Sequence, residues 1–224
     1  MFDPESALFP AEENYDLFLD RDSYVKMWIE SLPHWEQECK TQYVTFRLTD
    51  SLPSSKLMVL YDIRAGFAAS HPELSGESLR KECRKLLSPR YNMYLDAGYG
   101  SCILRRPEIR RILSDSLEYN DGVAYDLLGY VVMPNHVHIV MRMLGKHEAN
   151  DVMKSIKRFC TTQMNKRFNT GTRLFSENWD RLIRNESHLK YVLNYILNNP
   201  RSLYPDEYTL GGRIIKNFLN QQKH

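Results

Sequence analysis

The chain has 224 residues, of which 42% are hydrophobic and 26% charged, with a formal net charge of +2. This is the composition of an ordinary globular protein with one sizeable domain. No stretch approaches the roughly 20 apolar residues of a membrane-spanning helix, and the acidic N-terminus lacks the basic and apolar regions of a signal peptide. The cysteines have no Cys-x-x-Cys spacing and give no support to a zinc finger; they are Cys39, Cys83, Cys102 and Cys160. We therefore expect a cytoplasmic protein with reduced thiols and no membrane partner.

The charge is distributed unevenly along the chain. Residues 1–40 carry ten acidic and three basic side chains, whereas residues 142–190 carry eleven basic and five acidic ones. A localised basic surface is typical of a protein that binds a polyanion. The alternative is an ordinary solvated helix face, and charge alone does not separate the two.

The first half of the chain predicts an extension followed by a strand and helices. Residues 1–40 are expected to lie over the core as an N-terminal extension, with one short helix at 21–32. The β-branched and aromatic content of 41–48 predicts a strand. Residues 54–95 predict a mostly helical insertion, interrupted near 71–78, where Ser75 or Ser78 would cap a second helix.

The second half predicts alternating strands and helices. Residues 98–104 predict a strand, and an amphipathic helix is expected from Pro107, which suits a first helical turn. Two further strands, 123–133 and 136–143, are separated by Pro134 and Asn135, consistent with a hairpin.

Two helices close the predicted domain. A helix over 150–168 has an apolar stripe with a spacing of four residues, made of Val152, Ile156, Cys160, Met164 and Phe168. A last helix, 186–199, would stop at Pro200, which leaves 201–224 as a tail. The order of elements predicts an α+β fold with helices against an antiparallel sheet.

The stretch "VVMPNHVHIV" places two histidines inside an apolar strand. Residues two apart on a strand share a face, so His136 and His138 project together while Val137 and Ile139 face the core. Two neutral imidazoles at this spacing can bind one divalent cation. The alternative is two ordinary half-buried histidines, and a metal site would need a further ligand from elsewhere.

The last predicted helix offers such a ligand. Tyr191, Tyr195 and Asn199 are spaced by four and form one stripe. A phenol there could act as a nucleophile, and the Asn199 carboxamide could be a third hard ligand. Alternatively, the tyrosines lie at the edge of the core and Asn199 ends the helix.

"VVMPNHVHIV" followed by "YVLNYILNNP" resembles the REP-associated tyrosine transposases, which belong to the HUH group of single-strand transposases and nucleases. The resemblance extends over about 41–200 and includes "VTFRL", "LDAGYGSCIL" and "LFSENWDRLIRNESHLK". It implies a ferredoxin-like antiparallel sheet with the HUH motif on a central strand. It also implies that His136, His138 and Asn199 are metal ligands and that Tyr195 is the nucleophile. The chain departs from the family at Arg201, where "NPV" is usual.

The resemblance implies a single-strand DNA endonuclease and strand transferase that depends on Mg²⁺ or Mn²⁺ and acts on repeated hairpins (REP-type DNA) through a 5′-phosphotyrosine. The absence of a Walker-type motif agrees, because the protein–DNA linkage conserves the bond energy. Basic side chains are the expected phosphate contacts; they are Lys154, Lys157, Arg158, Lys166, Arg167, Arg173, Arg181 and Arg184. Trp179 could stack on a base or belong to the core, and Asp180 could pair with Arg181.

Two rival functions remain open from the sequence. One is a relative that binds hairpin DNA without cutting it, and the other is a phosphodiesterase in which the two histidines activate water. A monomer is favoured over a homodimer, because both motifs could meet within one chain. When bound to DNA, the protein would associate with the nucleoid.

Overall fold

A computed structural model of the chain describes residues 17–29 and 33–222. The first elements are β1 (Lys26–Ile29), β2 (Pro33–Glu36), β3 (Thr41–Arg47), α1 (Ser54–Ser70), α2 (Gly76–Asp96), the 3-10 helix η1 (Ile103–Arg105) and α3 (Pro107–Tyr119). They are followed by β4 (Tyr125–Val132), β5 (His136–Met143), α4 (Ala149–Phe168), β6 (Trp179–Leu182), α5 (Glu186–Asn198), η2 (Asn199–Ser202), β7 (Thr209–Gly211) and α6 (Arg213–Gln221). None of the helices in the described ranges combines the length and the apolar character that crossing a bilayer would require.

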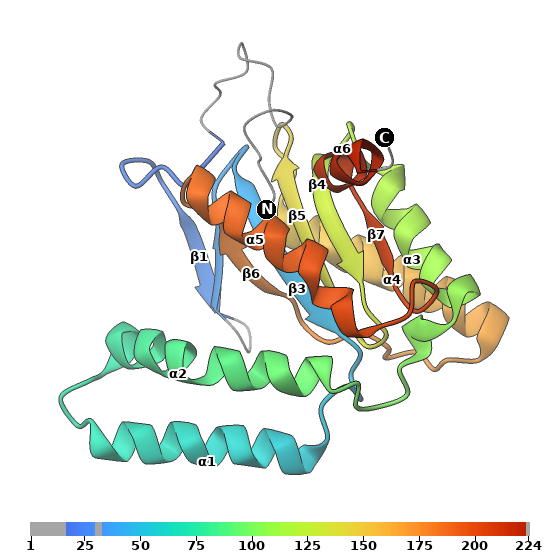
Figure 1. The fold of residues 1–224 in the computed structure, drawn as a ribbon. Coiled ribbons are helices and arrows are strands. Elements are labelled where there is room, and N and C mark those ends of the chain that lie inside the picture. Colours follow the sequence, from blue (N-terminus) through green and yellow to red (C-terminus); the bar gives the residue numbers. More distant parts are fainter. Residues whose placement is uncertain (1–16, 30–32, 223–224) are drawn as a thin grey trace.

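An antiparallel sheet forms the centre of the molecule, with strand order β6-β3-β5-β4-β7 and β5 in the middle (Figure 1). The elements β3-α3-β4-β5-α4-β6, with spatial order β6-β3-β5-β4, form the βαββαβ arrangement of ferredoxin-like folds. The predicted α+β class with a ferredoxin-like sheet is therefore confirmed. On β5, His136 pairs with Arg47 and His138 pairs with Thr45 of β3.

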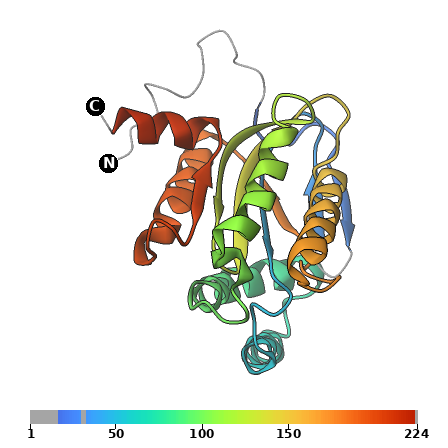
Figure 2. The ribbon, with the colours of Figure 1, turned by 90° about the vertical axis from the view of Figure 1, so that its right-hand side faces the viewer.

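Helices α3 and α4 cover one face of the sheet. The alternating residues of β5, including Val137 and Ile139, are fully buried there against the α4 residues Ile156 and Cys160. Figure 2 separates this layer from α5 and α6, which lie on the opposite side of the sheet. Every second residue of β5 thus packs against residues spaced by about four on α4, as their sequence patterns predict.

Helices α5 and α6 pack closely on the second face. Val140 of β5 lies in a buried cluster with Leu193 of α5 and Ile215 of α6. This close approach depends on Gly129 of β4, where an added Cβ would lie 2.9 Å from the side chains of both Leu193 and Ile215. The glycine therefore allows the two helices to reach the sheet.

The insertion between β3 and α3 is a pair of helices, α1 and α2, as the sequence predicted. The pair extends away from the sheet, and the C-terminal end of α2 approaches its lower edge in the view of Figure 1. Arg47 Nε donates a hydrogen bond of 3.1 Å to the Tyr91 hydroxyl, and Asn135 Nδ2 donates one of 3.1 Å to the Leu95 carbonyl. These contacts attach the end of α2 beside the start of β5.

Two predicted elements are wrong. The helix expected at 21–32 is replaced by β1, which pairs with β2; residues 30–32 lie outside the described ranges. The strand expected at 98–104 is a tight loop, because Gly100 and Cys102 have φ of 85° and 47°, and it ends in η1. The short strands β6 and β7 and helix α6 are not predicted by local pattern, and each depends on pairing or packing with distant residues.

A buried carboxyl group connects β2 to the start of α4. Glu36 is 5% exposed, one carboxyl oxygen accepts a hydrogen bond from the Ala149 backbone N–H, and the other has no partner among the described residues. Burial raises the pKa of Glu36 to about 7, although the hydrogen bond from Ala149 acts in the opposite direction.

We predict that Glu36→Gln stabilises the protein in alkaline solution. Because the folded-state pKa exceeds the unfolded value of about 4.3, the wild type loses stability as pH rises from about 4 through 7. The variant should be more stable by about 3 kcal/mol at pH 8 and equal near pH 4. Urea unfolding at both pH values measures this difference, with the exposed Glu38→Gln as control; a difference independent of pH would contradict the prediction.

Candidate active site

The central strand presents both histidines to the face covered by α5. His136 and His138 are 1% and 2% exposed, and their ring centroids lie 4.8 Å apart. Their neighbours Val137 and Ile139 belong to the core on the opposite face. The strand alternation inferred from the sequence therefore places the two imidazoles side by side.

Asn135 orients the ring of His136. The Asn135 amide nitrogen donates to the carbonyls of Leu95 and Tyr99, at 3.1 Å each, so its Oδ1 must be the atom 2.8 Å from His136 Nδ1. A carboxamide oxygen only accepts, so Nδ1 carries the proton and Nε2 presents a lone pair to the site.

Hydroxyl groups of β3 hold the second imidazole. His138 Nδ1 lies 2.7 Å from the Tyr43 hydroxyl and 2.9 Å from Thr45 Oγ1. The Tyr43 ring also stacks on His138, with centroids 5.7 Å apart. Partners of this kind orient a ligating histidine through the nitrogen that does not bind the metal.

Helix α5 brings the phenol and the carboxamide to the histidines. The Tyr195 ring lies edge-on to His138 with centroids 5.1 Å apart, and Asn199 follows at the end of the helix. Four buried polar atoms have no hydrogen-bond partner among the described residues: His136 Nε2, His138 Nε2, Tyr195 Oη and Asn199 Oδ1. Buried polar atoms are rarely left unpaired, so their occurrence in one place indicates a ligand site.

Burial sets the protonation states of these groups. It lowers the pKa of His136 to about 3, although the Asn199 side chain acts in the opposite direction. It also lowers the pKa of His138 well below its ordinary value. It also raises the pKa of Tyr195 far above that of a free phenol, and the negative charge of Asp96 adds to this. The imidazoles are therefore neutral, as metal ligands must be, and the phenol needs a nearby cation or base in order to ionise.

The donor set suits a divalent cation. Within the described ranges, no three His, Cys, Asp or Glu side chains are grouped so as to hold a metal ion. The set consists instead of two imidazole nitrogens and the Asn199 oxygen, all buried and unpartnered. Imidazole nitrogens and a carboxamide oxygen are both donors that divalent metal ions accept in proteins.

Most of the basic residues expected to bind DNA lie away from the histidines. Helix α4 covers the opposite face of the sheet, and it carries Lys154, Lys157, Arg158, Lys166 and Arg167. Lys157 is half-buried there and donates to the Ser176 carbonyl at 2.9 Å. The basic residues of α4 and the two histidines therefore cannot contact the same short segment of a DNA strand.

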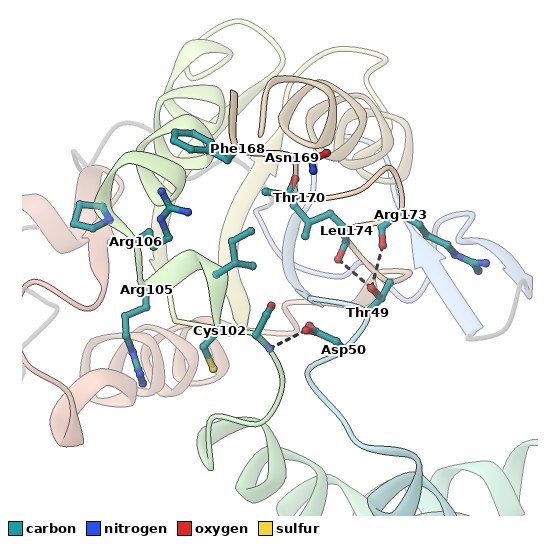
Figure 3. A pocket seen from close by; sticks show the side chains of 13 residues that line it. Thr49, Asp50, Cys102, Arg105, Arg106, Phe168, Asn169, Thr170, Arg173 and Leu174 are labelled. Atoms are coloured by element: carbon teal, nitrogen blue, oxygen red, sulfur yellow. Dashed lines mark hydrogen bonds between the residues drawn. The ribbon is translucent and has the colours of Figure 1, made fainter. Parts of the chain in front are cut away.

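Arg173 belongs to a separate pocket of about 800 Å³ between the end of α4 and the start of α3. Figure 3 shows its side chain directed away from the other lining residues, while its carbonyl accepts a 3.0 Å hydrogen bond from the Thr49 hydroxyl. The pocket also contains Arg105, which pairs with Glu207, and Arg106, which pairs with Glu108.

Arg181 lies on the same face of the sheet as the histidines, and Arg84 and Arg184 lie near enough to act on its charge. We call these three residues the site-face arginines. Arg181 pairs across the sheet with Tyr43, and its guanidinium lies 5.0 Å from the centre of the Trp179 ring. Burial lowers the pKa of Arg181, and the positive charges of Arg84 and Arg184 lower it further. None of the three has a carboxylate partner in the described part of the chain.

Arg84 is not predicted from the sequence, because it lies on the helical insertion and no local pattern relates it to β6. Trp179 is partly buried and packs against the apolar cluster beneath α5, so it contributes to the core. The pairing considered between Asp180 and Arg181 is wrong, because consecutive strand residues point to opposite faces. Asp180 instead contacts the buried His34 of β2.

Comparison with known proteins agrees with the motifs. Residues 105–199 match the model of a family described as IS200-like transposases; this segment contains His136, His138, Tyr195 and Asn199. The resemblance to tyrosine transposases is thereby confirmed, and a transposase-like role in DNA processing is supported.

A solved structure described as the REP-associated tyrosine transposase bound to a REP hairpin is also similar. The two chains share 14% identity with a TM-score of 0.43, over 83% of this chain and 93% of the other. No curated protein is significantly similar in sequence. At so low a TM-score the likeness is distant, and the site is defined by the geometry of this chain.

We predict that His136 remains neutral at pH 5 in the metal-free protein, because burial holds its pKa near 3. Nitrogen-15 NMR of the imidazoles should show an unprotonated Nε2 and a protonated Nδ1 throughout pH 5–8. His136→Asn assigns the signal by its loss. Conversion to a doubly protonated ring between pH 7 and pH 5 would contradict the assigned burial and hydrogen bonding.

Proposed function

We propose that the chain cleaves and rejoins single-stranded DNA through a covalent phosphotyrosine at Tyr195. The observation that carries this proposal is the convergence of a phenol, two neutral imidazoles and a carboxamide, each with a buried and unpartnered polar atom. A structural core rarely leaves buried polar atoms without a partner, and here four of them lie close together. A scissile phosphate with its cation would supply partners to all four.

Each side chain has a distinct part in the reaction. His136, His138 and Asn199 would hold Mg²⁺ or Mn²⁺, which supplies charge stabilisation at a non-bridging phosphate oxygen. Tyr195 loses its proton and its oxygen bonds to phosphorus, while the bond from phosphorus to the 3′-oxygen breaks and that oxygen gains a proton. The 5′-phosphate then remains on Tyr195. Attack by another 3′-hydroxyl reverses these bond changes and joins a new strand.

Two separate basic surfaces suit a substrate with a strand and a hairpin. Arg181 lies next to Tyr43, which contacts His138, so the site-face arginines would hold the DNA strand that enters the site. The cations of α4, on the opposite face, would contact a more distant part of a longer DNA. Repeated hairpin DNA of REP type, as implied by the motifs, is the substrate we propose.

We predict that Tyr195→Phe abolishes the covalent protein–DNA adduct. Wild-type protein, Mn²⁺ and single-stranded oligonucleotides from repeats flanking the gene would be incubated and resolved on a denaturing gel. Tyr191→Phe is a matched control, because Tyr191 lies one turn earlier on α5 and is 70% exposed. It should retain the adduct, whereas the double variant His136→Ala/His138→Ala should lose it.

Other outcomes would identify the rival functions. Cleaved DNA without linked protein, and cleavage retained in Tyr195→Phe, would indicate a phosphodiesterase that activates water. DNA binding without either product would indicate a non-catalytic hairpin-binding protein. An adduct retained in Tyr195→Phe would mean that another residue is the nucleophile.

We predict that the two basic surfaces respond differently to DNA length. Arg84→Gln/Arg181→Gln should weaken binding of a short single strand about tenfold, because two cations that contact phosphates are lost. The salt dependence of binding should fall as well. Lys154→Gln/Arg158→Gln should leave the short strand unaffected and weaken a hairpin substrate. Fluorescence anisotropy at several salt concentrations measures both. Equal losses for both DNAs in both variants would contradict this division.

A further inference from the structure

The pocket of about 800 Å³ lies at the end of the sheet where β5 begins. Leu48, which follows β3, donates a backbone hydrogen bond of 2.8 Å to the Asn135 carbonyl, and Leu104 of η1 donates one of 3.1 Å to the Pro134 carbonyl. The chain neighbours of both leucines line the pocket. His136 is the first residue of β5, so a DNA strand that passes His136 and turns around this end of the sheet reaches the pocket.

The interior of the pocket offers an aromatic ring and a guanidinium group. Phe168, the last residue of α4, is partly buried, and the Arg106 guanidinium lies 5.0 Å from the centre of its ring. Figure 3 shows these two side chains next to each other on one wall. Proteins stack unpaired bases on aromatic rings and guanidinium planes, and a pocket of this volume is large enough for a nucleotide.

Other polar groups of the pocket suit the edge of a base. The Thr170 hydroxyl oxygen is buried and has no hydrogen-bond partner among the described residues. Asp50 accepts a 2.7 Å hydrogen bond from the Ser101 backbone N–H. A carboxylate accepts hydrogen bonds from the amino group of a base but repels a phosphate. The interior therefore suits a base better than it suits a phosphate.

The rim of the pocket carries a positive charge for the phosphate. Arg173 is exposed, and Figure 3 shows its side chain directed away from the other lining residues. It has no carboxylate partner in the part of the chain that the structure describes. Arg105 and Arg106 instead pair with Glu207 and Glu108. Arg173 is thus the cation best placed to contact a phosphate next to a base inside the pocket.

We infer that this pocket binds one unpaired base of the DNA strand that enters the active site, with the base against Phe168 and Arg106 and the adjoining phosphate on Arg173. The inference rests on the proposed function for its ligand, a DNA strand, but not on Tyr195 as the nucleophile. The strand would continue from the pocket to the basic residues of α4, because Lys166 and Arg167 directly precede Phe168.

The test is the binding of short single strands from the flanking repeats to full-length Tyr195→Phe protein, measured by fluorescence anisotropy, so that cleavage does not interfere. Strands that each lack one base, with an abasic sugar in its place, locate the base that the protein holds. Removal of that base should weaken binding about 10-fold. In Phe168→Leu/Thr170→Val, which removes the ring and the hydroxyl, the intact and abasic strands should bind equally weakly, because both changes remove the same contact.

Two further variants make this result specific. Arg111→Gln is the matched control, since Arg111 is 81% exposed on α3 and does not line the pocket; it should keep the full effect of base removal. Arg173→Gln changes only the exposed rim, and it should weaken binding of the intact strand and lower the salt dependence by about one phosphate contact. Circular dichroism confirms that each variant is folded.

The outcomes separate this inference from the proposed function. The pocket is not a base site if Phe168→Leu/Thr170→Val keeps the full effect of base removal, or if no single base affects binding; an adduct formed by the wild type would then still support Tyr195 as the nucleophile. If the effect is lost in the pocket variant but the wild type forms no adduct, the pocket stands and the proposed nucleophile fails. A wild-type protein that binds no single strand contradicts both proposals.

Discussion

The alternation of side chains along β5 is the constraint on which the rest of the structure depends. Because consecutive residues face opposite sides of the sheet, Val137 and Ile139 pack in the core while His136 and His138 lie in the site. A shift of one residue in its pairing with β3 would exchange these two sets. The apolar face packed by α3 and α4 therefore holds the imidazoles in register on the other face.

Burial gives these imidazoles their chemistry, and it has a cost. A buried polar atom without a hydrogen-bond partner is destabilising by about 1–3 kcal/mol relative to a satisfied one. The site contains four such atoms, two of them imidazole nitrogens. Asn135 holds the ring of His136 through Nδ1, and Tyr43 and Thr45 hold the ring of His138 through Nδ1, so both rings keep their orientation. Such a concentration of unsatisfied groups is expected where ligand binding, and not folding, supplies the missing partners.

The helical insertion changes how the domain is understood. By its position between β3 and α3 it resembles an added surface element, yet its last turn is bonded to Asn135 and its middle carries Arg84 toward β6. The end of α2 thus borders the site at His136, whereas α5 contributes Tyr195 beside His138.

The sequence by itself determined the elements with a strong local period. These were the two central strands, the long helices and the spacing of His136, His138, Tyr195 and Asn199, because strand alternation and helical stripes depend on near neighbours. It misassigned 21–32 and 98–104, where short pairing and positive φ angles override propensity. Only the tertiary structure decided that α4 lies on the face opposite the histidines and that Asp96 and Arg84 approach the site. These placements depend on strand order and long-range packing, which no local pattern encodes.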